Sequence, residues 1–446
     1  MSPSEIRSTL ERLGAAPLKA LGQNFLHDQN LAQWIVRRLE LAPGEHVVEI
    51  GPGLGALTTY LKRPGVSVTL LEKDAAYVSY LRENFAPPDF AVIAGDALDC
   101  DPRQFFAHRP VKLLGMLPYY VSSALLLHFT REPCPFSKVL VTVQKEVADR
   151  LTGAPGSKAY GSLSVALQRR WRIAKLRTLP ASVFLPRPRV DSSVVAMVPK
   201  SGSELPAVDS ERFEAVVRLG FRARRKQLRK VLAAEYPVER LEAAWAQIGL
   251  ADDLRAEMLS VQDWTDLTNA LAGERVEGNN TATELLQVVD GEDNPVGGLD
   301  RGTVHSEARL HRAVHVLLTN REGELLLQRR SVAKDRYPGR WDSSAAGHVD
   351  VGEDYERCAY REVVEELGFR VPLEFVGKLP ASEMTGYEFI AVFSGRADQN
   401  PSPNPLEIDA FGTFPLGVVD VWIERCPEDF APGFLSCYRL VRDRLS

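Results

Sequence analysis

Carboxylates with a regular spacing dominate one stretch of the chain, GHVDVGEDYERCAYREVVEELGF at residues 347–369. Glu362, Glu365 and Glu366 lie three and four residues apart, so a helix would place them on one face. Like charges on one helical face repel each other unless a cation lies between them. Because Mg²⁺ prefers oxygen ligands and usually shares them with phosphates, this spacing predicts a magnesium site that acts on a phosphate group.

Glycine and arginine residues occupy set positions around these carboxylates, in the pattern G-x5-E-x7-R-E-V-x-E-E-x-G-F. The pattern resembles the signature of the Nudix hydrolases with every fixed position filled, and we call this stretch the Nudix box. The resemblance implies that Glu362, Glu365 and Glu366 hold Mg²⁺. It also implies that Glu353 supports the loop and helix, that Arg361 pairs with a box carboxylate, and that the substrate is a small diphosphate.

The segments around the box carry a second resemblance. Residues 284–318 and 338–348 resemble the Nudix branch close to isopentenyl-diphosphate isomerases. Those isomerases need a cysteine near the site, which Ser343, Ser344 and Ala345 do not provide. We therefore prefer diphosphate hydrolysis to isomerisation.

Three further polar side chains lie on strands predicted near the box. His311 and His315 share one side of the strand that contains HRAVH, and Glu388 lies on the strand YEFIAVF. We interpret the histidines as packed core residues or as catalytic groups. Glu388 is either an additional metal ligand or an outward-facing strand carboxylate.

A glycine-rich turn marks a second site, at residues 49–55 (EIGPGLG). Glycines at the end of a strand let the backbone turn sharply and approach a ligand at a helix N-terminus. Glu72 ends the next predicted strand, where a carboxylate can accept from two ribose hydroxyls, and Asp96 suits an adenine amino group. Because the acidic Glu49 would disfavour a pyrophosphate, adenosine bearing a sulfonium fits better than a dinucleotide.

The glycine-rich turn belongs to one of eight motifs that follow each other along residues 16–270. They are LGQNFLHDQNL (21–31), EIGPGLGALT (49–58), LLEKD (70–74), AGDAL (94–98), VQKEVADRL (143–151), GSKAYGSLS (156–164), FLPRPRVDSS (184–193) and GFRARRKQLRK (220–230). This part resembles the KsgA family, the small-subunit rRNA adenine dimethyltransferases of late ribosome assembly. The resemblance implies S-adenosylmethionine as cofactor and 16S rRNA in the immature 30S subunit as partner. The implied cofactor-binding residues are Gln23, Asn24, Leu26, Gly51, Gly53, Glu72 and Asp96.

The loop that the resemblance makes catalytic departs from the family. The family sequence is Asn-Leu/Ile-Pro-Tyr, whereas this chain has Met116, Leu117, Pro118 and Tyr119. In the family the Asn oxygen and a backbone carbonyl accept from the adenine amine and direct its lone pair toward the methyl group, while Tyr119 and Phe184 would stack on the base. A thioether is a weak acceptor, so we expect a loss of about 10²–10³ in rate.

Two interpretations follow from the altered loop. The first unit is either a slow dimethyltransferase of adjacent adenines near the 3′ end of 16S rRNA, or a module that binds an assembly intermediate without methylating it. The complete cofactor motifs favour the enzyme.

Charge is divided unevenly along the chain. Residues 1–270 contain 35 Lys and Arg against 29 Asp and Glu, whereas residues 271–446 contain 19 against 30. Residues 151–230 are the most basic, with 17 against 5, and aromatic residues alternate with the charges there. This favours RNA as the partner, with no DNA expected. The predicted phosphate-binding residues are Arg169, Arg170, Arg172, Arg224, Arg225, Lys226, Arg229 and Lys230.

Composition predicts a cytoplasmic, globular protein with two or three domains. The chain has 446 residues, of which 45% are hydrophobic and 25% charged. It contains neither an apolar run long enough to cross a membrane nor a signal-peptide core. The five cysteines show no metal-ligand spacing, so we expect reduced, mostly buried thiols.

Strand-like and helical patterns alternate before the basic region, which predicts a parallel sheet. The expected strands are 46–50, 67–72 and 90–96, with helices at 55–63 and 75–84. The predicted fold is α/β, with four parts in chain order. They are a Rossmann-like methyltransferase domain (1–205), an all-helical RNA-binding domain (206–270), a linker (271–281) and an α/β/α Nudix sandwich (282–446), in which a hairpin, RAVHVLLTN followed by ELLLQRR, precedes the box helix.

Overall fold

The computed structural model describes residues 1–15, 23–200, 204, 208–272, 285–331, 334, 336–399, 401 and 407–445. The predicted linker, except for its first two residues, lies outside the described residues, as do Leu21 and Gly22. The chain forms two compact units, Met1–Pro206 with Ser210–Leu271, and Ala272–Ser446 with Ala207–Asp209. No described helix is long and apolar enough to span a bilayer. All five cysteines are free, as predicted.

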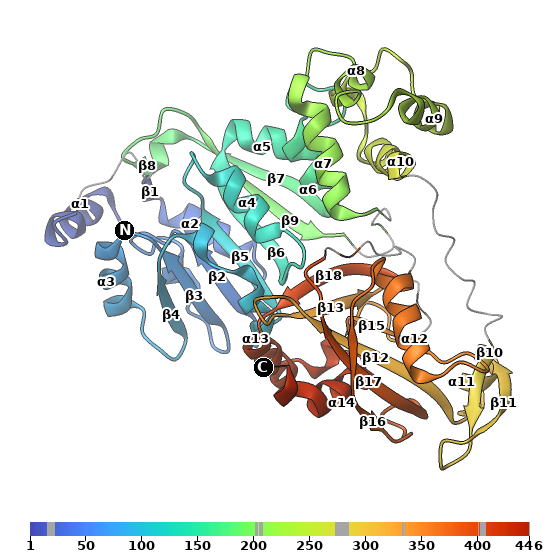
Figure 1. Cartoon of the computed structure of the whole chain (residues 1–446). Coiled ribbons are helices and arrows are strands. Elements are labelled where there is room, and N and C mark those ends of the chain that lie inside the picture. Colours follow the sequence, from blue (N-terminus) through green and yellow to red (C-terminus); the bar gives the residue numbers. More distant parts are fainter. Residues whose placement is uncertain are drawn as a thin grey trace. The chain divides into compact units, whose positions relative to one another are not determined.

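A seven-stranded sheet lies at the centre of the first unit (Figure 1). Its strands follow the order β4-β3-β2-β5-β6-β9-β7, in which the first five are parallel and the last two antiparallel. Their bounds are β2 His46–Ile50, β3 Ser67–Glu72, β4 Phe90–Ala94, β5 Val111–Met116, β6 Phe136–Gln144, β7 Trp171–Leu179 and β9 Ser192–Pro199. The strand order reverses between β2 and β5, and ligands of such sheets bind at the carboxyl ends beside this point.

Helices cover both faces of this sheet, as expected for parallel strands. They are α2 Gln29–Arg37, α3 Ala75–Asn84, α4 Ser122–Thr130, α5 Lys145–Leu151 and α6 Ser162–Gln168. A short pair, β1 Phe25–Leu26 with β8 Phe184–Leu185, and α1 Pro3–Arg12 complete the region.

The helix predicted at 55–63 is wrong, because only one 3-10 turn forms there, at Thr58–Tyr60. The hydroxyl of Thr58 donates to Glu49 Oε2 (2.7 Å), and that of Thr59 donates to the carbonyl of Gly55 (2.9 Å). Two adjacent β-branched residues with engaged side chains and Pro64 shortly after them oppose a regular helix.

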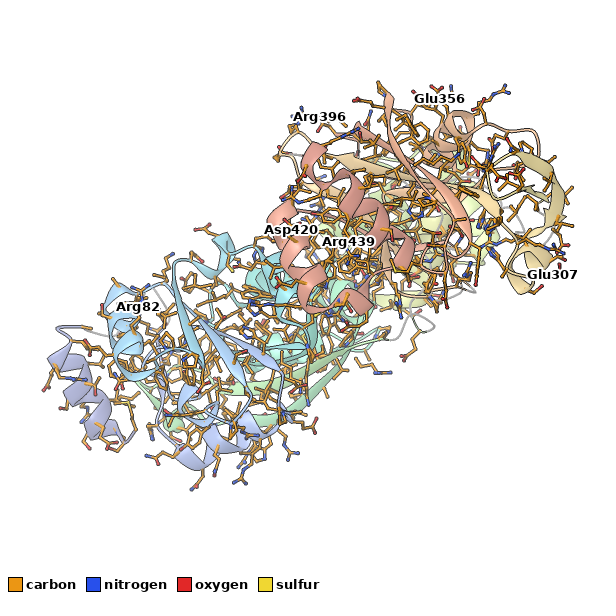
Figure 2. The ribbon with its side chains drawn as sticks, turned by 90° about the horizontal axis from the view of Figure 1, so that it is seen from below. Arg82, Glu307, Glu356, Arg396, Asp420 and Arg439 are labelled. Carbon is orange, nitrogen blue, oxygen red and sulfur yellow. The ribbon has the colours of Figure 1, made fainter. Side chains whose placement is uncertain are left out.

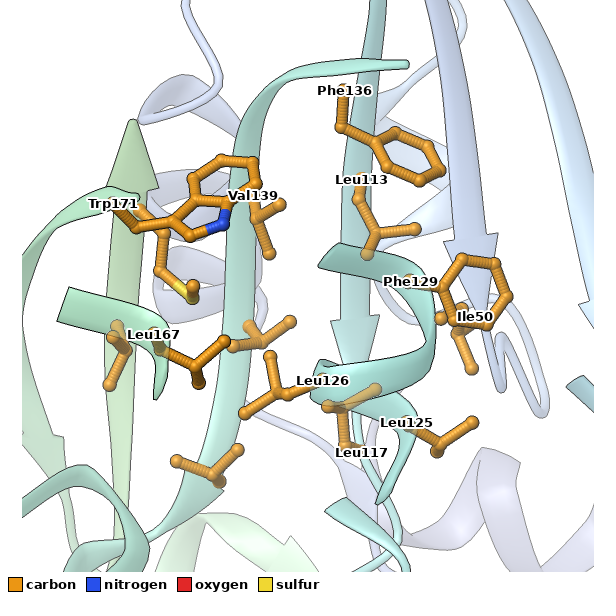
Figure 3. Close-up of a cluster of buried hydrophobic side chains, with 14 of the residues drawn as sticks. Ile50, Leu113, Leu117, Leu125, Leu126, Phe129, Phe136, Val139, Leu167 and Trp171 are labelled. Carbon is orange, nitrogen blue, oxygen red and sulfur yellow. The ribbon is translucent and has the colours of Figure 1, made fainter. Parts of the chain in front are cut away.

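Apolar side chains form a core on each face of the sheet. In the cluster of Figure 3, Leu113 of β5 and Val139 of β6 pack with Leu125 and Phe129 of α4. Leu114, the next residue of β5, belongs to the cluster on the other face. Alternate side chains of a strand point to opposite faces, so each strand contributes to both cores.

Four helices continue the first unit: α7 Ser210–Gly220, α8 Leu228–Leu232, α9 Val238–Ile248 and α10 Val261–Ala272. Gly220 allows α7 to approach α10 closely, because a Cβ at this position would lie 2.3 Å from the Trp264 ring. No strand occurs among the described residues 208–272, as the sequence predicted.

The second unit has the α/β/α arrangement predicted for residues 282–446. Its strands are β10 Leu285–Val289, β11 Pro295–Asp300, β12 His311–Thr319, β13 Leu325–Arg330, β14 Trp341–Asp342, β15 Ala345–His348, β16 Leu373–Leu379, β17 Glu388–Arg396 and β18 Ile408–Phe414, and its helices are α11 Arg301–Ser306, α12 Tyr355–Glu362, α13 Leu416–Arg425 and α14 Pro432–Val441. β12 is central, pairing with β10, β13, β15 and β17, and the predicted β12–β13 hairpin is confirmed.

Helices lie on both sides of β12. Cys358 and Ala359 of α12 share a core with Val314 and Val316, whereas α14 contacts β12 and β16. The two C-terminal helices carry Asp420 on α13 and Arg439 on α14 (Figure 2). The carboxylate of Asp420 joins these helices, because it accepts from Tyr438 Oη (2.8 Å) and Arg442 Nη2 (2.7 Å).

Candidate functional sites

A pocket lies at the carboxyl ends of β2, β3, β4 and β5, with a volume of about 930 Å³ including its open mouth. That volume is typical of small-molecule sites. The predicted site residues that line it are Gln23, Asn24, Gly51, Gly53, Glu72, Asp96, Met116 and Pro118. Leu26, Leu117, Tyr119 and Phe184 do not line it.

Glu72 is held rigidly at this pocket. Its Oε2 accepts from the N–H of Gly53 (3.0 Å), and its Oε1 accepts from the N–H groups of Lys73 and Asp74 (both 2.9 Å). Burial raises the pKa of Glu72, although the backbone donors oppose the shift. An oriented carboxylate at the end of the second parallel strand can accept from a ribose diol.

Three polar residues that line the pocket, Lys73, Tyr77 and Tyr120, were not predicted as site residues from the sequence. Lys73 forms an ion pair with Asp96 (Nζ–Oδ2 2.6 Å), which lowers the Asp96 pKa through this hydrogen bond. Tyr77 donates to Gln23 Oε1 (3.1 Å), and Tyr120 is exposed at the pocket. Of the three, only Lys73 could have been expected at the site from the sequence, because it directly follows Glu72, the last residue of β3.

Glu49 is buried under the glycine turn and does not line the pocket. Burial raises its pKa to about 8, although Thr58 donates to it. Its carboxyl group is therefore mostly protonated at pH 7, so the expected repulsion of a pyrophosphate by Glu49 is wrong. The selectivity of the pocket must come from other residues.

We expect Glu49 to make the first unit less stable as pH rises. An unfolded Glu ionises near pH 4.5, whereas folded Glu49 keeps its proton to about pH 8, so unfolding releases a proton in this window. Stability should fall by on the order of 3–5 kcal/mol between these pH values. In Glu49→Gln the fall should be smaller by this amount, measured by hydrogen exchange of peptides from β2 and β5 at several pH values. An equal fall in both proteins would contradict this assignment.

The altered loop begins at the end of β5. Met116 lines the pocket, and the N–H of Leu117 donates to the carbonyl of Thr142 (3.0 Å). Tyr119 Oη shares a hydrogen bond of 2.6 Å with Ser192 Oγ, and Phe184 is buried in the core. Base stacking by Tyr119 and Phe184 therefore stays a prediction.

The structure corrects the predicted basic face at Arg169, which is buried. Its guanidinium lies 5.0 Å from the centroid of the Phe213 ring and donates to Ser210 Oγ (2.6 Å), so it fastens α7 to the sheet region. Arg170 forms an ion pair with Glu132. Both side chains serve the fold rather than an open surface.

The other predicted cations differ in their exposure and in the contacts that they make within the protein. Arg224 donates to the carbonyl of Tyr160 (2.9 Å), and Arg229 pairs with Asp252 (2.7 Å). Arg172 pairs with Glu204 (2.8 Å) but is half-exposed. The exposed cations in the segment 221–230 after α7 are Arg222, Arg224, Arg225, Lys226 and Lys230.

Arg361 is the centre of the Nudix box. Its Nε and Nη2 donate to the two oxygens of Glu353 (3.1 and 2.9 Å), and its Nη1 donates to Glu362 (2.7 Å) and Glu365 (3.1 Å). Its Nη2 also donates to the carbonyl of His348 (2.9 Å). The expected pairing of Arg361 with box carboxylates is confirmed, and it ties the loop to the helix.

The three box carboxylates do not share one environment. Residues Val363–Leu367 form a π-helical turn after α12, which leaves Glu362 and Glu366 buried and Glu365 half-exposed. Arg361 Nη1 nevertheless contacts both Glu362 and Glu365, so these two carboxylates lie close together. The three carboxylates therefore differ in exposure, and their shared role as metal ligands stays a prediction.

The buried pair has features of a cation site. Burial raises the pKa of Glu362 well above the ordinary value and that of Glu366 to about 7. Glu366 Oε2 accepts from Ala346 N–H (2.9 Å) and Gln328 Nε2 (3.1 Å). Gly347 leaves room for Glu362, because a Cβ there would lie 2.1 Å from its carboxyl group. These residues fit a divalent cation, whose charge would offset the repulsion between the carboxylates.

A second pocket, of about 610 Å³ including its mouth, lies beside the box and is lined by Glu388 and by His315, but not by His311. Glu388 Oε1 lies 3.6 Å from Nε2 of His311 and of His348. His315 instead shares a hydrogen bond of 2.7 Å with Ser343 Oγ. His305 and His348 were missed by the sequence analysis, because isolated histidines in separate elements give no spacing signal.

Comparisons with known proteins cover both units. The family model of ribosomal RNA adenine dimethylase matches residues 18–273, and that of the NUDIX domain matches residues 309–426. The chain is similar to ribosomal RNA small subunit methyltransferase A of Marinobacter nauticus, with 37% identity over 57% of this chain and 91% of that protein. It is similar to the protein of the same name from Xanthomonas campestris, with 39% identity over 56% and 95%.

A solved structure is also similar, that of the 23S rRNA methyltransferase ErmE. It is 26% identical, covers 56% of this chain and 100% of that chain, and has a TM-score of 0.45. The family match extends over more than half of the chain. The chain belongs to the ribosomal RNA adenine dimethylase family and carries a NUDIX domain after it in the same polypeptide.

Proposed function

We propose that the first unit transfers methyl groups from S-adenosylmethionine to adenine N6 atoms of ribosomal RNA. The observation that carries this proposal is the Glu72 carboxylate, which three backbone N–H groups fix at the pocket beside the strand reversal. That position suits the ribose of an adenosine cofactor. The family membership of residues 18–273 supports the same chemistry.

The pocket residues fit this cofactor. Gly53 has φ +55°, and a Cβ there would lie 3.1 Å from the Phe25 ring, so a side chain at this position of the turn would be strained and crowded against Phe25. Asp96 can accept from an adenine amino group, because a carboxylate has capacity beyond its contact with Lys73. Bound S-adenosylmethionine supplies an electrophilic methyl group.

The loop after β5 would prepare the target amine. The lone pair of the amine nitrogen attacks the methyl carbon only when this lone pair is not delocalised into the adenine ring. Hydrogen-bond acceptors for the two N–H groups of the amine keep the lone pair on the nitrogen. The carbonyl of Leu117 is one candidate acceptor. Met116 is a poor second acceptor, because a thioether sulfur accepts hydrogen bonds only weakly. The N6 proton therefore leaves less readily as the N–CH₃ bond forms.

We propose adjacent adenines near the 3′ end of 16S rRNA, in the immature 30S subunit of the cytoplasm, as the target. The names of the two relatives above support a small-subunit substrate. The test is incubation with unmethylated 30S subunits and labelled S-adenosylmethionine, followed by mapping of the label. Label on those adenines supports the proposal, and label elsewhere in the rRNA contradicts the target.

Met116 favours a second candidate, in which the unit binds the assembling subunit without methylating it. Cofactor binding would then persist, because Glu72 and Asp96 are intact, but no label would transfer. Calorimetric titration with S-adenosylmethionine, beside the labelling assay, separates this function from loss of the pocket.

We expect RNA binding by the exposed cations to weaken steeply with salt, because each neutralised phosphate releases counterions. Arg225→Ala with Lys226→Ala should reduce the slope of log affinity against log salt by about 2. Arg82→Ala, on α3 (Figure 2), is the matched control and should leave the slope unchanged. The measurement is filter binding of the 16S 3′ region at several salt concentrations. A flat dependence for the unmodified chain would exclude this surface.

For the second unit we propose Mg²⁺-dependent hydrolysis of a small diphosphate. Glu362, Glu365 and Glu366 would hold the ion, which supplies Lewis acidity at the phosphates. Arg361 fixes the box loop, and Arg301 and Arg330 line the adjacent pocket, where they can pair with an anionic substrate. A panel of nucleoside diphosphate derivatives with Mg²⁺, scored by products, tests this. Activity that survives Glu362→Gln with Glu366→Gln would contradict it.

A further inference from the structure

The N-terminus of α14 lies at the second pocket of the second unit. Ala431, which precedes this ten-residue helix, and Gly433, its second residue, both line the pocket. No side chain caps the helix, and Pro432 at its first position has no N–H. Within the described part of the chain, the N–H groups of Gly433 and Phe434 make no hydrogen bond. These two donors and the positive end of the helix dipole are therefore available to a ligand in the pocket.

A buried histidine faces the same end of the helix. His315 is 6% exposed, lies on β12 and lines the pocket. Its neighbours Val314 and Val316 pack with α12 on one face of the sheet, so the His315 ring lies on the other face, with α14. A Cβ at Gly433 would lie 3.3 Å from both Cε1 and Nε2 of His315. The ring edge that carries Nε2 therefore adjoins the start of α14.

The hydrogen bonds of His315 decide which ring nitrogen carries the proton. Nδ1 shares a hydrogen bond of 2.7 Å with Ser343 Oγ, whereas Asp342 Oδ1 lies 3.7 Å from Nδ1. Among the described residues, Nδ1 is the one acceptor for the Ser343 hydroxyl, so this hydroxyl donates to Nδ1. The neutral ring then carries its proton on Nε2. His315 thus offers a third donor at the start of α14.

The charges that line the pocket also favour an anion. Arg301, Arg330 and Arg336 line it, together with the carboxylates of Asp342 and Glu388. Asp342 Oδ2 accepts from Arg330 Nη1 (3.0 Å), and Glu388 Oε1 lies 3.9 Å from Arg336 Nη1. Each carboxylate is therefore paired with an arginine. Because three guanidinium groups face two carboxylates, the lining has a net positive charge.

The pocket also reaches the Nudix box. Gly347 lines the pocket, and a Cβ at this position would lie 2.1 Å from the carboxyl group of Glu362. A ligand in the pocket can therefore have one end at the box and the other end at α14. The volume of about 610 Å³, including the mouth, leaves room for such a ligand.

We propose that the N-terminus of α14 and His315 form a subsite for an anionic group, a phosphate or a carboxylate, at the far end of a diphosphate substrate. The diphosphate end rests on the proposed hydrolase, whereas the subsite rests on α14 and His315 themselves. An anion at a helix N-terminus accepts from the free N–H groups and is stabilised by the helix dipole. An oxygen bound by Nε2 would lie about 2.7–3.2 Å from it, close to the place of a Cβ at residue 433, so Gly433 keeps the subsite open.

Titration with inorganic phosphate in the presence of a chelator tests the subsite without Mg²⁺ and without catalysis. The probe is the full chain labelled with ¹⁵N-histidine, in which the Nε2–H signal of His315 is assigned by its loss in His315→Gln. Phosphate should shift this signal in a saturable way. In Gly433→Ala, half-saturation should need at least about 10-fold more phosphate, because the added methyl group takes the place of the anion.

Gly417→Ala is the matched control. Gly417 is the second residue of α13, also a ten-residue helix without a side-chain cap, and a Cβ there would meet nothing within 4 Å. This variant should bind phosphate like the unmodified chain. Alanine favours a helix over glycine, so both variants should keep the second unit folded, which calorimetry checks. No shift of the His315 signal in the unmodified chain, or equal half-saturation in the two variants, would overturn the proposal.

Substrate preference gives a second test. With Mg²⁺, alkyl diphosphates that end in a phosphate or a carboxylate should have a kcat/KM at least about 10-fold above that of the same compound ending in a hydroxyl. The preference should disappear in Gly433→Ala and in His315→Phe, and persist in Gly417→Ala. If no diphosphate is hydrolysed, the proposed hydrolase fails and the phosphate titration still decides the subsite. An active hydrolase with equal kcat/KM for the three compounds would overturn the role of the subsite in substrate choice.

Discussion

Replacing Met116 with Asn should raise the rate of adenine methylation about 10²–10³-fold, because the amide restores an oriented hydrogen-bond acceptor at the target amine. Met116 lines the pocket at the end of β5, so the new oxygen would face the substrate. The hydroxyl of Thr142, its partner on β6, is buried and without a hydrogen-bond partner among the described residues. An Asn at this position can pair with that hydroxyl, which would fix its orientation.

Single-turnover labelling of unmethylated 30S subunits measures this effect. Met116→Leu, which also lacks an acceptor and has a similar volume, is the control and should match the unmodified chain. Label in both the unmodified chain and Met116→Asn supports a slow enzyme, and label only in Met116→Asn supports the binding module. Equal rates for Asn and Leu at position 116 would show that the side chain does not set the rate.

Replacing Arg361 with Met should destabilise the second unit by about 3 kcal/mol, because it leaves partly buried carboxylates without their cation. Arg361 contacts Glu353, Glu362 and Glu365, and its side chain is 24% exposed. For a unit of this size the loss corresponds to a fall in Tm of roughly 6–12 °C. Differential scanning calorimetry, which separates the transitions of the two units, is the measurement.

Arg357→Met is the matched control for this experiment. Arg357 lies one turn earlier on α12 and is exposed, so its loss should change Tm by no more than about 1–2 °C. If the box binds Mg²⁺ as proposed, added Mg²⁺ should recover part of the stability of Arg361→Met, because the ion would occupy the same carboxylates. Equal Tm values for the two variants would mean that the Arg361 contacts contribute little.

The elements that position both sites could be predicted from local patterns. The runs HVVEI and SVTLLE are buried parallel strands, and the capped segment 75–84 is a helix with the predicted bounds. The helix at 55–63 is opposed by local features of the sequence, the adjacent Thr58 and Thr59 and the following Pro64. The buried hydrogen bond from Thr58 to Glu49, which acts in the same direction, could not be predicted from the sequence.

The sites themselves were predictable only where their residues form motifs. The box and the pocket motifs placed their residues together, but the basic cluster could not show that Arg169 turns inward onto Phe213. The histidines around Glu388 come from separate elements, His305 from α11, His311 from β12 and His348 from β15. The pairing of β12 with β15 and β17 brings His311, His348 and Glu388 together. Such a cluster is encoded in sheet topology rather than in spacing.

The carboxylates at the π-helical turn Val363–Leu367 differ in their exposure to water. Glu365 is open to solvent, whereas Glu362 and Glu366 lie behind it. Mg²⁺ loses its hydration shell reluctantly and keeps several waters when bound to proteins. We therefore expect Glu365 to be the carboxylate that a hydrated ion could reach from solvent, whereas Glu362 and Glu366 would supply the ligands that replace its water.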